Sequence, residues 1–208
     1  MASQLPPERP ITSTPPTTER GMTGRIKRIL TEPKAEWPRI AAEPDTAMAV
    51  FKRWAVPLAA IPPVAGLIGG QLMGYRPPIG SAIATALLGY GAALLGVWVL
   101  TLIIEALAPT FRATKSRDEA MKLAAYSWTA AWVAGVLAII PPLAIIGAIA
   151  GLYSLYLLWL GLPVLMRAPE DQKVGYYVAV LVAALVVNFV IGAIVASVVI
   201  GGAASTIY

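Results

Sequence analysis

Residues 123–166 read LAAYSWTAAWVAGVLAIIPPLAIIGAIAGLYSLYLLWLGLPVLM, a run of 44 residues without a single charged side chain. As one helix rising about 1.5 Å per residue, this run would be about 66 Å long. The hydrocarbon core of a bilayer is only about 30 Å thick, so the run has to cross it twice. Adjacent prolines remove two backbone donors and break a helix, so Pro141 and Pro142 mark the turn. The run therefore predicts two membrane-spanning helices joined by a tight hairpin.

Three further apolar segments are long enough to cross a membrane. We expect five spans in all, at about residues 47–73, 81–108, 123–140, 143–166 and 174–200. Pro57, Pro62 and Pro63 lie inside the first span, which we expect to be kinked or partly broken. The composition agrees, because only 13% of the residues are charged, against about 25% in soluble domains. The sequence predicts an all-α membrane protein, a five-helix transmembrane bundle.

The distribution of positive charge predicts the orientation of this bundle. Fifteen of the sixteen Lys and Arg residues precede the first span, lie near its cytoplasmic end (Lys52 and Arg53), or lie in the loops after the second and fourth spans. Arg76 alone lies in the remaining loops. Cytoplasmic loops carry the excess of positive charge, so we expect a cytoplasmic N-terminus and a C-terminus outside. The same asymmetry explains the net charge of +5 without nucleic acid. No signal peptide is apparent, so we expect the first span to direct membrane insertion.

The chain divides into three parts by composition. These are a Pro/Thr-rich cytoplasmic tail at 1–21, a basic amphipathic interfacial segment at 22–45, and the five-span membrane domain at 46–208. The tail has few large apolar residues, and we expect it to be disordered on its own. In the second part, Ile26 and Ile29 share a helical face beside the cations of Arg25, Lys27 and Arg28. This pattern favours a helix on an anionic membrane surface; a solvated helix is the alternative.

The residue types argue against catalysis. The chain has no Cys and no His, which excludes thiolate metal sites and removes the commonest general base. We expect no enzymatic activity, no metal and no cofactor. Glu105 is the one carboxylate inside a predicted span, and we expect it to pair with Arg112, Lys115 or Lys122 rather than to relay protons. Asn188 lies in the middle of the fifth span, where we expect a hydrogen bond between helices, with a substrate contact as the alternative.

Small residues recur at intervals of four along the predicted spans. In lipid, such residues let helix backbones approach one another. The positions that we single out as candidate packing residues are Gly66, Gly70, Gly74, Gly147, Gly151, Ala193, Ser197 and Gly201. The main interpretation is packing within one bundle, and the alternative is packing against another protein.

The fourth span and its exit carry a more specific pattern. It runs GLYSLYLL from Gly151, then GLPVLM from Gly161, then Pro-Glu-Asp from Pro169. Its distinctive members are Tyr153, Tyr156, Gly161, Pro163, Met166, Pro169 and Lys173. In these residues the chain resembles the bacterial branch of the Yip family of membrane proteins. The resemblance implies five spans with a cytoplasmic N-terminus, and a role in membrane organisation and protein contact. The GTPase partnership of the eukaryotic members does not carry over, because their acidic Tyr-Gly-Pro-type motif has no clear match here.

These observations favour a multi-pass protein of the bacterial inner membrane that acts without catalysis. The leading hypothesis is an accessory, assembly or scaffold subunit that contacts membrane lipids and other membrane-protein chains. A transporter of small solutes or ions is the alternative, and it requires a cavity that reaches Glu105 or Asn188. A third possibility is a lipid-binding or curvature-sensing protein that acts through residues 22–40.

Overall fold

The computed structural model describes residues 21–72 and 78–204. In this part, four helices are long and apolar enough to cross a membrane, and these are Ala47–Leu72, Ile79–Phe111, Arg117–Ile139 and Glu170–Ser197. The all-helical membrane fold is confirmed. A further helix, α9 (Ala144–Leu165), lies where the sequence predicts the fourth span, and within it Ile149–Leu165 forms a shorter apolar helix. Residues 1–20 of the predicted tail and Gly74 lie outside the described residues.

The first span is divided into short helical pieces. These are α3 (Ala47–Val50), the π-helical η2 (Phe51–Ala55), α4 (Val56–Ala59) and α5 (Ile61–Leu72). Proline removes a backbone donor and clashes with the preceding turn, so Pro57, Pro62 and Pro63 account for the irregular backbone. The prediction of a partly broken first span is confirmed.

The third span is also divided, and the sequence pattern missed this break. It consists of α7 (Arg117–Ser127), α8 (Thr129–Ala134) and the 3₁₀ helix η4 (Gly135–Ile139), with a turn at Trp128. No proline marks that turn, which is why residues 123–140 read as one continuous helix. After Ile140, the 3₁₀ helix η5 (Pro141–Leu143) leads into α9. The predicted reversal at Pro141 and Pro142 is confirmed.

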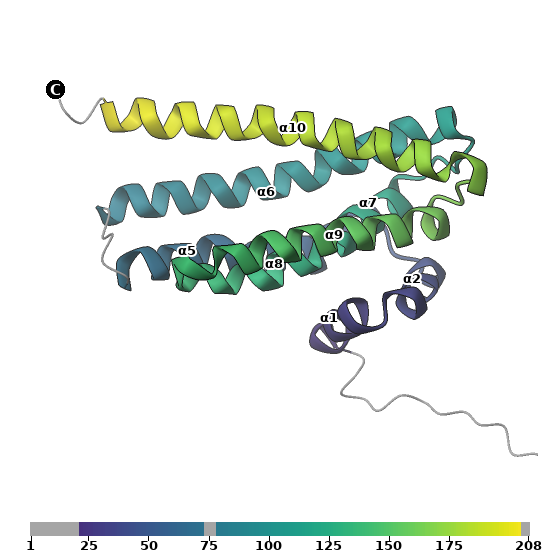
Figure 1. Ribbon diagram of the computed structural model, residues 1–208, viewed down its shortest axis with the longest axis horizontal. Helices are drawn as coiled ribbons and strands as arrows, with labels where there is room; N and C mark the ends of the chain where they lie inside the picture. The colour runs from purple at the N-terminus through teal and green to yellow at the C-terminus, as the bar shows by residue number, and fades with distance from the viewer. Residues whose placement is uncertain (1–20, 73–77, 205–208) are drawn as a thin grey trace, which may run out of the picture.

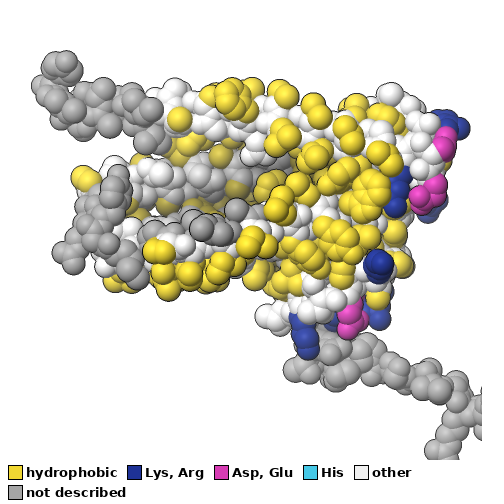
Figure 2. All heavy atoms as spheres, in the orientation of Figure 1, with side chains coloured by type: hydrophobic (Ala, Val, Ile, Leu, Met, Phe, Trp, Pro, Cys, Tyr) yellow, Lys and Arg dark blue, Asp and Glu magenta, His cyan; other side chains and the backbone are white. Residues whose placement is uncertain are grey.

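Helices α6 (Ile79–Leu107) and α10 (Glu170–Ala204) meet at one end of the molecule and separate toward the other, as Figure 1 shows. At the end where they meet, the Tyr176 hydroxyl donates to the Ile104 carbonyl oxygen over 2.5 Å. The Tyr176 ring also stacks on Phe111, which belongs to the 3₁₀ helix η3 (Ala108–Phe111). In the face seen in Figure 2, the Lys, Arg, Asp and Glu side chains gather at this same end, which we call the charged end.

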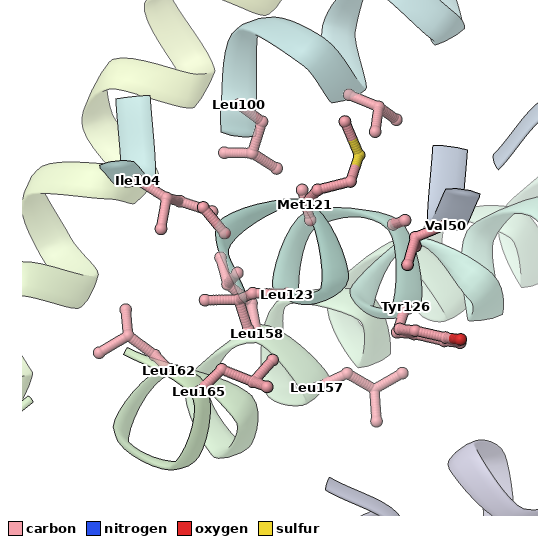
Figure 3. Packing of buried hydrophobic residues seen from close by; sticks show 14 of the residues in the cluster. Val50, Leu100, Ile104, Met121, Leu123, Tyr126, Leu157, Leu158, Leu162 and Leu165 are labelled. Carbon is pink, nitrogen blue, oxygen red and sulfur yellow. The ribbon is translucent and has the colours of Figure 1, made fainter. Parts of the chain in front are cut away.

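The core is built around α7. All eight residues from Ala120 to Ser127 are buried, so this helix is covered on every side. Figure 3 shows Leu100 and Ile104 of α6 on one side of it, and Leu157 and Leu162 of α9 on the other. Alanines at 120, 124 and 125 allow these neighbours to approach closely. A central helix covered in this way holds the surrounding elements at the charged end in fixed positions.

The first and third spans touch backbone to backbone. A Cβ added at Gly69 would lie 2.5 Å from the carbonyl oxygen of Ala138 and 2.6 Å from that of Ile139. A Cβ added at Gly135 would meet the ring of Pro62. Both glycines are therefore required by the close approach of α5 to η4.

Candidate functional site at the charged end

Two short helices, α1 (Met22–Thr31) and α2 (Pro33–Ala42), form a hairpin that packs against the side of the bundle near the charged end (Figure 1). We call this unit the amphipathic hairpin. Pro33 occupies the first turn of α2, where its missing N–H costs nothing, and it prevents α1 from continuing past Glu32. The apolar face of the hairpin is covered by the bundle, because the side chains of Ile29 and Ile40 are buried.

Trp37 anchors the hairpin to α9. Its side chain is completely buried, and a Cβ added at Gly161 would lie 2.7 Å from two carbons of the indole ring. The same Cβ would lie 2.7 Å from Leu123 of α7. The indole thus fills the space that any larger residue at 161 would need. Eight residues before Gly161 on α9, the Tyr153 hydroxyl donates to the carbonyl oxygen of Leu30 over 2.7 Å.

A buried carboxylate lies at the centre of the hairpin. Glu36 is only 1% exposed, and its carboxylate lies 2.9 Å from Nε of Arg28, 3.3 Å from Arg39 and 3.6 Å from Nε of Arg25. A carboxylate removed from water needs such partners, because an unpaired buried charge is strongly unfavourable. Glu36 therefore holds α1 and α2 together through the arginines.

Arg25 extends this network to the bundle. Its guanidinium makes a two-pronged ion pair with Glu43 and donates to the Tyr126 hydroxyl of α7 over 2.9 Å. Burial by itself lowers the pKa of a guanidinium, but the hydrogen bond to Glu43 and the proximity of Tyr126 outweigh burial and raise the pKa of Arg25. Arg25 consequently remains charged and fixed between the hairpin and α7.

Lys122 fastens the segment after the hairpin to α7. Its side chain is 2% exposed, and Nζ donates to the Glu43 carbonyl oxygen over 2.6 Å and to the Glu119 carboxylate over 2.8 Å. The Asp118 carboxylate accepts from the backbone N–H of Ala47 over 2.6 Å. The start of the first span and the start of α7 are therefore joined by charge-assisted hydrogen bonds.

The structure places the predicted surface cations in two different environments. Arg25 and Arg28 turn toward the carboxylates of the hairpin, whereas Lys27 is exposed. Lys34 is exposed on the same unit. The outward charge of the hairpin is thus carried by Lys27, Lys34, Arg39 and Glu32, whereas Arg25 and Arg28 serve internal ion pairs.

Several residues of the fourth-span pattern gather where α9 meets its neighbours. Tyr153 and Gly161 contact the hairpin, as described above, and the Tyr156 ring lies 5.6 Å from the Tyr153 ring. The carbonyl oxygen of Met166, a buried residue, accepts from the Thr114 N–H over 2.7 Å. The Lys173 ammonium lies 4.5 Å from the ring centre of Trp159. Two prolines complete the pattern, Pro163 inside α9 and Pro169 just before α10.

The two polar residues singled out in the spans make contacts other than those expected. Glu105 pairs with Arg117 over 2.8 Å. Two of the three partners named for it are engaged elsewhere, since Arg112 pairs with Asp171 and Lys122 is buried beside Glu119.

Asn188 makes its hydrogen bond within its own helix, where its amide donates to the Ala184 carbonyl oxygen over 3.4 Å. The expectation of a hydrogen bond between helices was therefore wrong. Asn188 lines the cavity between α10 and its neighbours and bonds only within α10. A cavity between α6, α8 and α10 reaches Asn188, but Glu105 is not among the residues that line it.

The small residues at four-residue spacing face outward more often than inward. A Cβ added at any of four of them would meet no other atom within 4 Å, and these are Gly66, Gly70, Gly147 and Gly151. Ala193 and Ser197 are exposed on α10, and Gly201 lies near the end of that helix. The four glycines at 66, 70, 147 and 151 therefore do not serve the packing of helices within the bundle. Gly69, Gly135 and Gly161 make the close approaches instead. The spacing argument selected none of these three, and Gly161 was named only as a member of the fourth-span pattern.

Comparison with known proteins gives one family. The family model described as the Yip1 domain matches residues 27–192, which include α2 and about the first two thirds of α10. The inner membrane protein YohC of Escherichia coli strain K12 is 26% identical over 159 residues, which cover 71% of this chain and 82% of YohC. YohC of Escherichia coli O6:H1 is similar to the same extent. No solved structure matches the chain significantly.

Proposed function

The chain belongs to the Yip1 domain family, and from that premise we propose that it is an inner-membrane protein that acts through contacts with other proteins, as an accessory, assembly or scaffold subunit. Its relative YohC is an inner membrane protein. Since four helices in the described part of the chain are suited to crossing a membrane, the chain is a multi-pass membrane protein. Its candidate interaction sites are therefore the surfaces that can meet other chains or lipid.

The docked amphipathic hairpin is the observation that carries this proposal. Its apolar side chains are used within the chain, since Ile29, Trp37 and Ile40 are at most 1% exposed. A helix that acts by inserting into a membrane surface needs such a face to be free. The exposed side of the hairpin is charged, with Lys27, Glu32 and Lys34 all open to solvent. A fixed, charged surface of this kind suits recognition of an acidic partner protein.

The outward-facing glycines support the same proposal. Gly66 and Gly70 on α5 have no neighbour within 4 Å of an added Cβ, and neither have Gly147 and Gly151 on α9. Small residues on a lipid-facing helix surface allow another transmembrane helix to approach closely. Such surfaces favour a role beside other membrane proteins.

We also propose five spans, with the N-terminus and the charged end in the cytoplasm. The helix α9 has 22 residues, and a span needs about 20. Adding α9 to the four long helices gives an odd number, which places the two termini on opposite sides. The excess of Lys and Arg in the loops of the charged end supports the cytoplasmic assignment.

Photo-crosslinking from the hairpin tests the proposed function. A photoreactive residue at position 34 in the full-length chain is expected to give a reproducible crosslink to one partner chain in intact cells. The double variant Lys27→Glu, Lys34→Glu is expected to lose that partner in mild-detergent purification, because it reverses the charge of the exposed surface. Lys115→Glu is the control, since it changes an exposed lysine on the loop after α6. A monodisperse protein without a reproducible partner would contradict the proposal.

A transporter is the second candidate, and one observation favours it. The cavity between α6, α8 and α10 reaches the amide of Asn188. Its other lining residues are small, aliphatic or aromatic, which suits an apolar occupant better than a hydrated solute. Solute uptake by proteoliposomes that disappears in Asn188→Leu would favour transport over the scaffold role.

A further inference from the structure

A group of cationic and aromatic side chains lies near the point where α9 ends and α10 begins, which Figure 1 places at the charged end. The Lys173 ammonium lies 4.5 Å from the ring centre of Trp159. Tyr177, one turn after Lys173, meets the Trp159 ring edge-on, with 5.1 Å between the ring centres. Arg167 belongs to the turn that joins the two helices. We call these four residues the junction cluster, and the proposed contacts with partner proteins make no use of it.

The junction cluster borders the lipid-facing side of the bundle. Val174 and Val178, which directly follow two cluster residues on α10, are both exposed. Tyr156, one turn before Trp159 on α9, is exposed as well. On a membrane-spanning helix such side chains face lipid, and Trp and Tyr gather at the level of the headgroups. The cluster therefore lies beside lipid headgroups rather than in open water.

The charge of Lys173 has no strong partner within the chain. Its side chain is 17% exposed and lies against the indole, although a lysine near the end of a span usually extends into water. Among the described residues, one carboxylate lies within 4.0 Å of its ammonium, and this is the carboxylate of Glu170. Glu170 is 84% exposed and lies at that limiting distance, so the ion pair is weak.

Arg167 is the one arginine in residues 21–72 and 78–204 that has no carboxylate within 4.0 Å. The other six are paired, and these are Arg25, Arg28, Arg39, Arg53, Arg112 and Arg117. The Arg167 side chain is exposed and donates no hydrogen bond within the described part of the chain. The indole N–H of Trp159 has no acceptor there either. The cluster thus presents two cations and one further donor at the membrane boundary.

An anion with several acceptor oxygens complements this set of donors. A phosphate accepts hydrogen bonds from guanidinium and ammonium groups, and basic pockets between membrane-spanning helices bind lipid headgroups. Lipid also covers this side of the two helices at all times. A zwitterionic headgroup would bring its own ammonium toward Arg167 and Lys173, which repel it. We propose that the junction cluster binds the phosphate of one anionic phospholipid from the leaflet at the charged end.

Native mass spectrometry of the full-length protein tests the proposal, in mild detergent with equal amounts of phosphatidylglycerol and phosphatidylethanolamine. The wild-type chain is expected to retain phosphatidylglycerol in preference to phosphatidylethanolamine. Arg167→Gln and Lys173→Gln are each expected to lower this preference about fivefold, because each removes one cation beside the headgroup. Lys173→Arg keeps the charge and is expected to keep the preference.

Lys115→Gln is the matched control. It removes the same charge from an exposed position between α6 and α7, outside the junction cluster. This control is expected to prefer phosphatidylglycerol as the wild type does. An equal loss of preference in the control would show that retention follows the total charge of the charged end, and it would overturn the proposed site.

Each other result would also overturn the proposal. Equal retention of the two lipids by the wild type, or an unchanged preference in both glutamine variants, would place any bound lipid elsewhere. Displacement of the lipid by an equal concentration of inorganic phosphate would show that the ligand is a free anion. A photoreactive residue at position 174 is expected to crosslink to phospholipid, and a crosslink to another protein chain in its place would assign the cluster to a partner. Two variants on different segments keep the test valid if one of them fails to fold.

Discussion

The indole of Trp37 lies directly over Gly161, at the position that a side chain of residue 161 would occupy. A Cβ built on Gly161 would be 2.7 Å from Cε2 and Cζ2 of Trp37 and 2.7 Å from Leu123. These three residues come from the amphipathic hairpin, α9 and α7, which are far apart in the sequence. Their contact is therefore the point at which the hairpin is joined to the membrane domain.

Replacing Gly161 by valine is expected to displace Trp37. The indole is completely buried and cannot move away without disturbing Leu123, so the added side chain should destabilise the fold by about 1–3 kcal/mol. The measurement is the thermal unfolding midpoint of the purified protein in detergent. Gly151→Val on the same helix is the control, because a Cβ there meets nothing within 4 Å. Equal midpoints for the two variants would show that this contact does not hold the hairpin.

Neutralising Glu36 is expected to release the hairpin without unfolding the bundle. The variant Glu36→Gln keeps the size of the side chain but leaves Arg25 and Arg28, each about 20% exposed, without their shared carboxylate. Removing one partner of a buried ion pair costs on the order of 3 kcal/mol, which corresponds to about a hundredfold more frequent local opening. Limited trypsin digestion after Lys34, followed by mass spectrometry, measures this opening.

The control for this experiment lies in the same turn. Glu32 is exposed between α1 and α2, so Glu32→Gln removes the same charge without creating a buried cation. Its cleavage rate should match that of the wild-type chain. If Glu36→Gln is cleaved no faster than Glu32→Gln, the buried network does not hold the hairpin in place.

The hydrophobic pattern was sufficient to predict the membrane fold but not the docking of the hairpin. The uncharged run over 123–166 fixes the reversal at Pro141 and Pro142 because the bilayer limits helix length. The break at Trp128 has no such signal, since neither proline nor a charged residue interrupts the run there, although the polar residues Ser127 and Thr129 flank it. It depends on packing between α7, α8 and α9, which a single sequence does not display.

The candidate site shows the same limit more sharply. Helical periodicity at Ile26 and Ile29 correctly predicts an amphipathic α1, but periodicity does not reveal whether lipid or protein covers the apolar face. Glu36 and Trp37 carry the hairpin contact, and the sequence analysis singled out neither as part of a site. The available signal was the alternation of acidic and basic residues across 25–43, which is consistent with ion pairs between two short helices.

Two adjacent glycines on α5 are expected to respond in opposite ways to the same substitution. A Cβ at Gly69 would lie 2.5 Å from the Ala138 carbonyl oxygen, and backbone atoms cannot move aside as a flexible side chain can. Gly69→Val should therefore separate the first and third spans, with a loss of about 2–3 kcal/mol or failure to fold. Gly70→Val meets nothing within 4 Å and should be close to neutral in the isolated protein. Folded yield and thermal midpoint in detergent compare the two, and similar values would contradict the contact between α5 and η4.

Labelling of single cysteines is expected to show the charged end in the cytoplasm. The chain contains no Cys, so each introduced thiol is the one reactive site. Lys115 is exposed between α6 and α7, and Ser81 is exposed at the opposite end of α6. With a membrane-impermeant maleimide, Ser81→Cys should be labelled in intact spheroplasts, whereas Lys115→Cys should react only after lysis.

The position of α9 adds an independent check, because Arg167 is exposed just after it. If α9 crosses the membrane, Arg167→Cys should behave as Lys115→Cys does, since two spans separate them. Labelling of Arg167→Cys in intact spheroplasts together with protection of Lys115→Cys would rule out the five-span arrangement. Labelling of Lys115→Cys in intact spheroplasts would reverse the orientation.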